Sequence, residues 1–208
     1  MELRVLRVPF STNVERVALA LAHKDLAVTW VDVDDADRSA VRALSGQDLV
    51  PVLETGEGEV VADSMGIIAR LEALAPEPAL WPADAARRVE TDIAIEWFNE
   101  VWKRPPNAIA AERGRLVPDE TAMAADAADL ARWLPWFEAL LDDRDFLLGD
   151  ALGAFDVCCF PFLKFGVLPP EPGDPDVFHA VLAETLPIAG RLPRLEAWVR
   201  RVDALPRA

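Results

Sequence analysis

Three neighbouring polar residues, Ser11, Thr12 and Asn13, stand between an extended stretch and a helical one in VPFSTNVERVALALAHK, residues 8–24. Each is a good helix N-cap, but a helix start needs only one capping side chain. Thr12 fits a T-x-x-E capping box in which Glu15 reaches back to the N-cap. This interpretation leaves the Ser11 hydroxyl for a group bound over the helix start, where an anion is favoured. The alternative is that Ser11 is itself the cap and Thr12 is incidental.

The elements that must position this hydroxyl follow from the hydrophobic periodicity of the first 75 residues. The order is β-α-β-α-β-β-α, and a strand–helix–strand start followed by a hairpin and a helix predicts a mixed four-stranded sheet covered by helices. The AVTWVDVD stretch is apolar on both faces, as in a buried parallel strand. The expected elements are strand 3–9, helix 13–23, strand 27–34, helix 36–45, the hairpin strands LVPVLET and EVVAD, and a helix that Ser64 caps and that stops at APEP.

A proline-rich connection, APEPALWPAD at residues 75–84, predicts a domain boundary. We expect a first domain over residues 1–76, a linker over 77–84 and an all-helical domain over 85–208. The fold class is therefore α+β, a βαβαββα domain followed by a helical bundle. The expected helices of the second domain are 85–104, ended or kinked by Pro105 and Pro106, 119–142, bent at Pro135, 154–166, 175–185 and 190–203.

The composition excludes several classes of function. The 208 residues carry 21 basic and 36 acidic side chains, a net charge of −15, which argues against a nucleic-acid partner. No run reaches the length of a membrane helix, and the N-terminal stretch lacks signal-peptide architecture, so we expect a cytoplasmic protein without a membrane partner. Cys158 and Cys159 lack metal-ligand spacing, and no metal site is expected. The chain contains no tyrosine.

Several motifs in this order resemble those of the cytosolic glutathione transferases, over essentially the whole chain. The resemblance implies a thioredoxin-like first domain, a helical second domain, glutathione as co-substrate and a homodimer. The first motif is most similar to the serine type of the phi class and its bacterial relatives, where S-T-x-x-x-R-V opens the first helix. The motifs are FSTNVERVALAL, LVPVL with Pro51 at the family's cis-proline, ADS at 62–64, FLLGDALGAFD at 146–156, and LPRLEAWVRRVDALP.

The resemblance implies that Ser11 stabilises a thiolate. Members that activate the thiol with a tyrosine are excluded, and the two cysteines lie far from the first helix. A free thiol of pKa about 8.5 is roughly 3% ionised at pH 7. Lowering that pKa by about two units needs about 2.7 kcal/mol. A helix N-terminus supplies about 0.3–1 kcal/mol, and a hydrogen bond to charged sulfur about 1.5–3 kcal/mol.

The rest of the thiol site is implied by the same resemblance. A cis Val50–Pro51 bond would turn the backbone of Val50 toward an extended peptide, which would bind like an added strand. Ser64 would hold a carboxylate at the start of its helix, and Asp63 the glutamyl ammonium. The expected thiol-binding residues are Val50, Pro51, Asp63, Ser64, Asn13 and Arg38.

The chain departs from the family pattern just before Pro51. Where the family often reads S-P-x-G-K/Q-V-P, this chain has Asp48 and Leu49, so the polar residue expected beside the glycyl carboxylate is an apolar one. Arg38, Arg42 or Gln47 could substitute, and a low-molecular-weight thiol other than glutathione is an alternative co-substrate.

The second substrate is implied to bind between the domains, against the first half of the helix beginning at residue 85. Trp97, Val101 and Trp102 are candidates for that wall, with core or dimer packing as the alternative, and their bulk suggests a hydrophobic electrophile. The sequence thus predicts a detoxification transferase that conjugates a thiol to such electrophiles. The alternatives are a non-catalytic ligand- or protein-binding member of the fold, and a thiol-dependent isomerase or dehalogenase.

Overall fold

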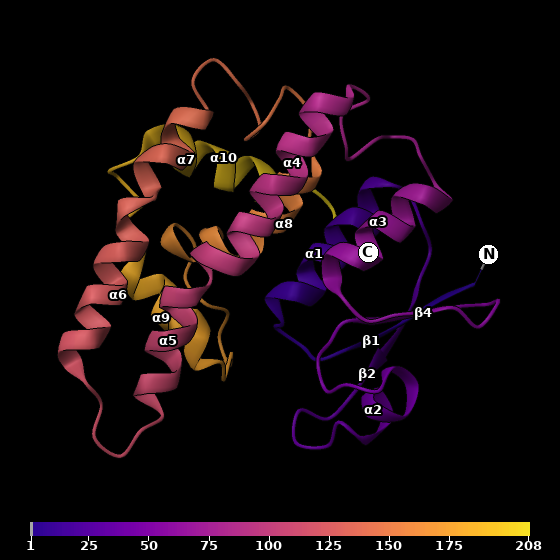
Figure 1. The fold of residues 1–208 in the computed structure, drawn as a ribbon, viewed down its shortest axis with the longest axis horizontal. Helices are drawn as coiled ribbons and strands as arrows, with labels where there is room; N and C mark the ends of the chain where they lie inside the picture. The colour runs from indigo at the N-terminus through magenta and orange to yellow at the C-terminus, as the bar shows by residue number, and fades with distance from the viewer. Residues whose placement is uncertain (1) are drawn as a thin grey trace. The chain divides into compact units, whose positions relative to one another are not determined.

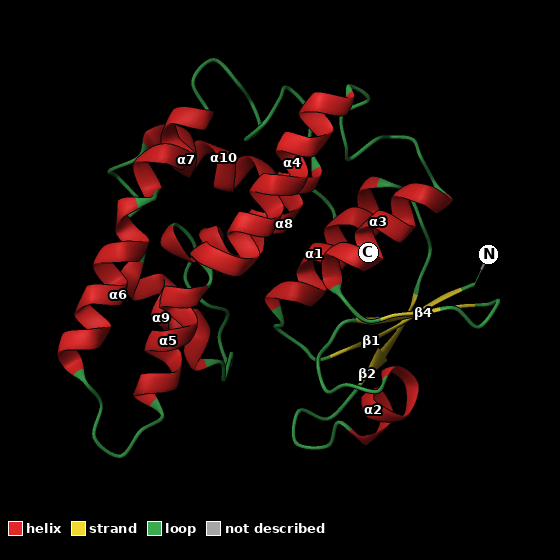
Figure 2. Cartoon of the chain, viewed as in Figure 1, coloured by secondary structure: helices red, strands yellow, loops and turns green. Residues whose placement is uncertain are grey.

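A computed structural model describes residues 2–208 and divides them into two compact units. The first unit holds the residues up to Leu80 together with Leu205–Ala208, and the second holds Trp81–Ala204. All four strands belong to the first unit, and the second is built from helices (Figure 2).

The first unit contains a four-stranded sheet in the order β2-β1-β3-β4. β1 pairs in parallel with β2 and antiparallel with β3, which in turn pairs antiparallel with β4. The β3–β4 hairpin and the mixed sheet are as the sequence predicts. The strands are β1 (Leu3–Arg7), β2 (Thr29–Asp32), β3 (Val52–Thr55) and β4 (Val60–Val61).

Helices cover both faces of this sheet (Figure 1). α1 (Thr12–His23) and α3 (Ser64–Leu74) pack together on one face, and α2 (Ser39–Ser45) covers the other. Alternation along β1 explains the two layers, because Leu6 joins Val41 of α2 in one apolar cluster while its neighbours point to the opposite face. The predicted βαβαββα order is therefore observed, and its fold is that of a thioredoxin-like domain.

Two predictions for this unit are wrong in detail. The 27–34 stretch is not buried on both faces, since β2 is an edge strand whose first and last residues are exposed. One face of Trp30 is instead covered by the guanidinium of Arg7, 4.8 Å from the ring centroid. The helix expected over 36–45 begins only at Ser39, because the Asp37 carboxylate accepts the Ser39 backbone N–H at 2.9 Å and holds the preceding loop in a turn.

A buried lysine fastens the segment that leaves this unit. The side chain of Lys24, the C-cap residue of α1, is wholly inaccessible. Its Nζ donates to the carbonyl oxygens of Ala75 at 2.7 Å and Pro78 at 3.0 Å, and pairs with Glu72 at 2.5 Å. The chain after α3 is therefore held against α1 by one cation.

The second unit is helical, and its central helix is α8 (Ala154–Leu163), all of whose residues are buried. Asp156 on α8 is buried with its carboxylate accepting from the Leu147 N–H at 2.8 Å, the Gly153 N–H at 3.0 Å and Trp198 Nε1 at 2.8 Å. The helices are α4 (Ala85–Trp97), the π-helical turn η1 (Phe98–Trp102), α5 (Arg104–Arg113), α6 (Glu120–Arg132), α7 (Leu134–Leu140), α8 (Ala154–Leu163), the 3-10 turn η2 (Lys164–Gly166), α9 (Val177–Thr185) and α10 (Pro193–Asp203).

Two long helices expected in this unit are each divided. The predicted 85–104 helix ends in the π-helical turn, and Pro105 and Pro106 lie in the first turn of α5, where a missing N–H costs no hydrogen bond. The predicted 119–142 helix breaks at Trp133, since Pro135 cannot donate to the preceding turn and instead opens α7.

Candidate functional site

The four elements expected to bind a thiol meet at one edge of the sheet. Because β1 and β2 are parallel, their carboxyl ends share this edge, where β1 leads toward Ser11. The antiparallel β3 begins there, directly after Pro51, and β4 ends there, just before Ser64. The order along the edge is therefore α3 start, Pro51, Ser11, and then the loop from β2 to α2.

Ser11 is the N-cap residue of α1, so the prediction that Thr12 caps this helix is wrong. The Ser11 Oγ accepts the Val14 N–H at 3.4 Å, and Thr12 is the buried first residue of the helix. The side chain of Glu15 pairs with Arg207 at 3.1 Å. In this chain one residue, Ser11, is therefore both the cap of α1 and the candidate catalytic group.

Capping does not consume the Ser11 hydroxyl. A hydroxyl offers one donor and two acceptor lone pairs, and the Val14 N–H engages one lone pair only. The residue is half-buried, so its O–H remains able to donate to a group above the helix start. The arrangement therefore retains a proton donor at a position where the helix already favours an anion.

A buried arginine joins the starts of α1 and α3. Arg16 is 1% exposed, and its Nη1 donates to Asn13 Oδ1 at 3.1 Å and to Ser64 Oγ at 3.2 Å. Since a guanidinium can face only the oxygen of an amide, this contact turns the Asn13 Nδ2 away from Arg16. Sequence reasoning assigned Arg16 no role, although a charged residue flanked by the apolar residues of a largely covered helix was a usable signal.

The residue that caps α3 is Asp63, so the prediction that Ser64 caps this helix is wrong. The N-cap is Asp63, whose Oδ1 accepts the Gly66 N–H at 2.8 Å, whereas Ser64 is the first helical residue and is buried. Ser64 is therefore not the cap, and its hydroxyl instead accepts a hydrogen bond from Arg16. Asp63 is exposed and keeps its second carboxylate oxygen at the surface.

The Val50–Pro51 peptide bond is cis, as predicted. Val50 is half-buried and packs against the apolar cluster of Leu6, Val41 and Val52, which fixes the side chain on the α2 face of the sheet. Its backbone lies at the same edge as Ser11, directly before β3.

The candidate cations near the α2 end of this edge are engaged by the protein. Arg38 pairs with the Asp35 carboxylate, and Arg42 Nη1 lies 2.7 Å from Asp48 Oδ1. The amide of Gln47 is held by the backbone of Leu49, to whose carbonyl oxygen it donates at 2.9 Å. These three side chains were the candidates to replace the polar residue that the family has beside the glycyl carboxylate. Each of them already contacts protein groups, and none is held ready for a ligand carboxylate alone.

The candidate acceptor-substrate residues lie in the second unit and differ in accessibility. Val101 is 41% exposed and Trp97 is half-buried, packing edge-on against the rings of Trp133 and Trp136. Trp102 is completely buried and stacks on Phe98 at 4.4 Å, so it offers no surface to a substrate. At 100° per residue Trp102 shares one helix face with the buried Ile95 and Phe98, so the core-packing alternative holds for this residue.

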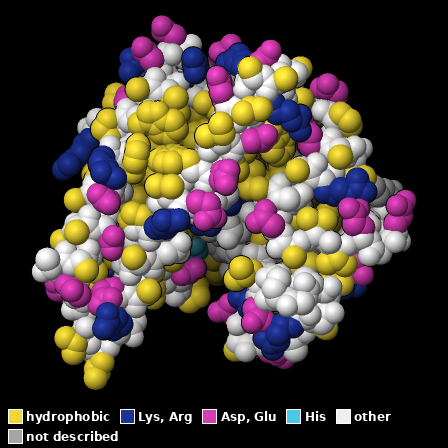
Figure 3. Space-filling view, in the orientation of Figure 1, with side chains coloured by type: hydrophobic (Ala, Val, Ile, Leu, Met, Phe, Trp, Pro, Cys, Tyr) yellow, Lys and Arg dark blue, Asp and Glu magenta, His cyan; other side chains and the backbone are white. Residues whose placement is uncertain are grey.

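Sequence reasoning also missed Trp133 and Trp136, which extend the aromatic surface around Trp97. Trp136 is 37% exposed. Figure 3 shows hydrophobic side chains gathered on the same face of the second unit, over α4 and α7. Two tryptophans three residues apart on one predicted helix were the signal for this surface.

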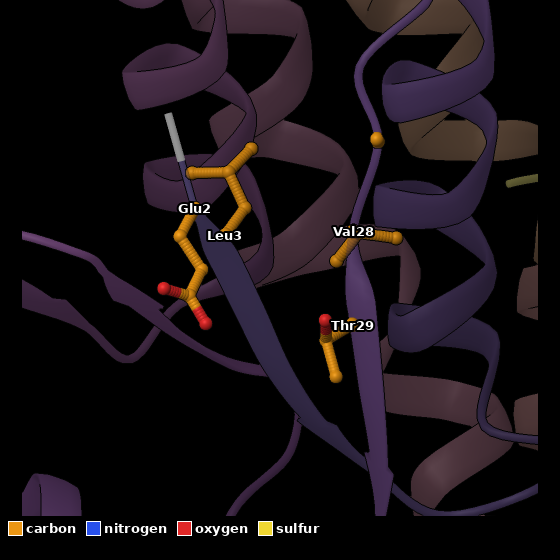
Figure 4. A pocket seen from close by; sticks show the side chains of 5 residues that line it. Glu2, Leu3, Val28 and Thr29 are labelled. Atoms are coloured by element: carbon orange, nitrogen blue, oxygen red, sulfur yellow. The ribbon is translucent and has the colours of Figure 1, made fainter.

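A surface depression of about 440 Å³ lies elsewhere, between the starts of β1 and β2 (Figure 4). It is lined by Glu2, Leu3, Ala27, Val28 and Thr29. Because both strands run from this depression toward the other edge, it lies at the end of the sheet opposite Ser11. Among the described residues its lining includes no cation, and we do not assign it to the thiol site.

Residues 2–208 contain no group of three or more histidine, cysteine and carboxylate side chains arranged to hold a metal ion. Within the same range, every helix is too short or too polar to cross a lipid bilayer.

Comparison with known proteins gives consistent matches. Residues 6–79 match the family model described as glutathione S-transferase, N-terminal domain. Maleylacetoacetate isomerase of Pseudomonas aeruginosa is 38% identical over 169 residues, covering 76% of this chain and 80% of that protein. Glutathione S-transferase GstB of Escherichia coli is 28% identical over 165 residues, 74% of this chain and 77% of GstB. The crystal structure of a glutathione S-transferase from Rhodospirillum rubrum has a TM-score of 0.76 at 24% identity, over 97% of this chain and 88% of that one, which shows a shared fold.

Proposed function

The chain belongs to the glutathione S-transferase family, and from this premise we propose that it is a serine-type transferase of cytoplasmic detoxification, most similar to the phi class. It holds the thiol of glutathione or a related peptide at the sheet edge described above. It transfers the sulfur to an electrophilic carbon of an apolar substrate. The observation that carries the proposal is the Ser11 hydroxyl, which caps α1 through its oxygen and keeps its proton for a ligand.

In the proposed reaction the thiol loses its proton to solvent, and Ser11 donates a hydrogen bond to the resulting sulfur anion. The start of α1 and the outward Nδ2 of Asn13 add further stabilisation of that charge. The sulfur lone pair then forms a bond to the electrophilic carbon, whose leaving group departs with the electrons of the bond that breaks. No other group on the chain needs to change its covalent state.

The remaining thiol contacts are proposed from the same edge. The backbone of Val50, before Pro51, pairs with the peptide as an added strand would. The N-terminus of α3 at Ser64 receives the α-carboxylate of the glutamyl end, and the free oxygen of Asp63 its ammonium group. Arg38, paired with Asp35, is retained only as an outer neighbour of the opposite end.

The acceptor substrate is proposed to contact Trp97 and Val101, the two candidates that the structure leaves accessible. We also propose a homodimer, as the family resemblance implies. Support comes from the outward face of α4, where Val89 is 56% and Ile93 is 61% exposed, since apolar helix surface of this kind is often covered by a partner.

A second candidate function is a thiol-dependent isomerase. The 38% identity to maleylacetoacetate isomerase of Pseudomonas aeruginosa favours it. Such an enzyme would use the same Ser11 chemistry and differ in the second substrate, with the sulfur leaving again at the end of the reaction.

The test is an ultraviolet titration of the bound thiolate against pH, in the parent protein and in Ser11→Ala. Loss of one hydrogen bond to the charged sulfur, about 1.5–3 kcal/mol, should raise the pKa of the bound thiol by about 1–2 units. Ser11→Thr, which keeps a hydroxyl, should restore most of the effect. Thr12→Val, a matched change at the neighbouring buried hydroxyl, should leave the thiol pKa unchanged.

Two results would count against the proposal. An unchanged pKa of the bound thiol in Ser11→Ala would remove Ser11 from the chemistry. Weak ligands bind with dissociation constants in the millimolar range. If no binding is detected at a thiol concentration of about 10 mM, the result would favour a non-catalytic member of the family.

A further inference from the structure

The edge that holds the candidate thiol site differs in charge between its two ends. At the α3 end, the buried guanidinium of Arg16 lies beneath Asn13 and Ser64, and the starts of two helices add positive partial charge. This end suits an anionic group.

The α2 end is acidic. The loop from β2 to α2 carries Asp34 and Asp37, which accept the backbone N–H groups of Ala36 and Ser39 at 2.9 Å and form no ion pair within residues 2–208. The Ser39 N–H holds the pKa of Asp37 below its ordinary value, which keeps that carboxylate ionised. Figure 3 shows acidic and basic side chains side by side over α2.

The arginines at this end are each paired with an aspartate. The one nitrogen of Arg38 without a partner, Nη1, is sealed from solvent and cannot reach a ligand. The carboxylates of this end therefore outnumber the cations, and each of its three arginines already faces a carboxylate of the protein. The pairs are Arg7 with Asp32, Arg38 with Asp35 and Arg42 with Asp48.

The segment that leads into Val50 adds an apolar group beside this acidic loop. Leu49 is 74% exposed and projects at the position directly before Val50. Gln47, the nearest amide, donates to the carbonyl oxygen of Leu49 and accepts its N–H, so it has little capacity for a ligand carboxylate. A ligand that passes Val50 toward α2 therefore meets Leu49 and Asp48.

We propose that the thiol taken by this site is a peptide whose only carboxylate lies at the α3 end, and whose other end is uncharged, as in a carboxamide or ester. This inference rests on the proposed function, since it assumes that the sulfur lies over Ser11. It deepens that function by naming the class of co-substrate. Leu49 covers the uncharged end, and Asp48 disfavours a carboxylate there.

The size of the preference follows from the charges. Two exposed like charges about 4 Å apart in water repel enough to change a binding constant about fivefold. Because Arg42 partly neutralises Asp48, we expect the glycyl carboxamide of glutathione to bind about two- to fivefold more tightly than glutathione itself. The ratio should shrink toward one at about 0.5 M salt, because exposed charges are then screened.

The experiment is calorimetric titration of the full chain with glutathione and with its glycyl carboxamide, alongside ultraviolet detection of the bound thiolate. The double variant Asp48→Asn with Leu49→Gln frees Arg42 and adds an amide, so the preference for the carboxamide should disappear or reverse. Glu57→Gln is the matched control, because it removes one carboxylate from the β3–β4 turn at the opposite end of the sheet. That variant should keep the parent preference.

The outcomes separate the inference from the function on which it rests. A carboxamide preference that disappears or reverses in the double variant but persists in Glu57→Gln supports the inference. Equal binding of both thiols, or tighter binding of glutathione, overturns it while leaving the proposed function standing. If neither thiol binds and no thiolate absorbance develops, the proposed function fails and the inference with it.

Discussion

Replacing Asp156 by asparagine should alter the stability of the helical unit in a pH-dependent way. The carboxylate is 1% exposed and accepts three hydrogen bonds, from two backbone N–H groups and Trp198. Burial raises its pKa to about 6, although those hydrogen bonds oppose the rise. An asparagine cannot accept through its NH2 group, so the Gly153 N–H loses its acceptor, which costs about 1–3 kcal/mol.

The sign of the pH effect follows from the direction of the shift. A carboxyl group whose pKa is higher in the folded state than in the unfolded chain binds its proton more tightly when folded. Its contribution to stability is therefore fully present below about pH 4 and is lost as the pH rises through about 6. Between pH 5 and pH 8 the loss amounts to about 1.4 kcal/mol. Asparagine does not titrate. The difference in free energy of unfolding between the parent and Asp156→Asn should therefore be larger at pH 5 than at pH 8, by that amount.

The assay is urea unfolding followed by tryptophan fluorescence at pH 5, 6.5 and 8 and constant ionic strength. Every tryptophan except Trp30 lies in the second unit, so the signal reports mainly on the unit that holds Asp156. Asp150→Asn, the same change at an exposed position nearby, is the control and should shift stability by less than about 0.5 kcal/mol at each pH. A difference between parent and Asp156→Asn that stays constant, or that grows toward pH 8, would refute the reasoning.

Two further substitutions test the packing of each unit by urea titration. Lys24→Met should destabilise the first unit by about 2–4 kcal/mol, because it leaves the largely covered carboxylate of Glu72 without its cation; a loss below about 1 kcal/mol, as expected for the exposed ion pair of Arg70 with Glu59, would show that the cation is dispensable. Gly166→Ala should cost the second unit about 1–3 kcal/mol, because the added Cβ would lie 2.6 Å from Ile188 Cδ1. Adding Ile188→Val should recover part of that loss, and no recovery would assign the cost to the backbone instead.

The element order of the first unit could be predicted because its strands alternate or are continuously apolar and its turns carry glycine. The hairpin and the cis Val50–Pro51 bond agree with prediction, the latter through the family resemblance. The edge position of β2 could not be predicted from its sequence. A central strand buried on both faces and an edge strand covered by an arginine side chain show the same apolar pattern. The order of strands in a sheet depends on which strands pair, and the sequence of a single strand does not determine it.

The capping residues were assigned one position too late at both helix starts of the site. Ser11 caps α1 and Asp63 caps α3, whereas Thr12 and Ser64 were expected. When two good caps are adjacent, local propensity does not choose between them. Here the tertiary contact decides at α3, because the Ser64 hydroxyl faces the buried Arg16.

In the helical unit, helix breaks were harder to predict than helices. A wheel drawn at 100° per residue places Trp102 on the same face as the buried Ile95 and Phe98, so its burial agrees with the core-packing alternative. Periodicity does not locate the break at η1, because the buried positions keep the same spacing through it.

One guanidinium, that of Arg16, contacts both Asn13 and Ser64, so the two ends of the proposed thiol site are supported by the same side chain. A ligand that displaces Ser64 at the α3 end would also displace Asn13, the residue proposed to lie beside the sulfur. A substitution that improves ligand binding at the α3 end should therefore also change the reactivity of the thiol at the α1 end, and the two properties would have to be optimised together.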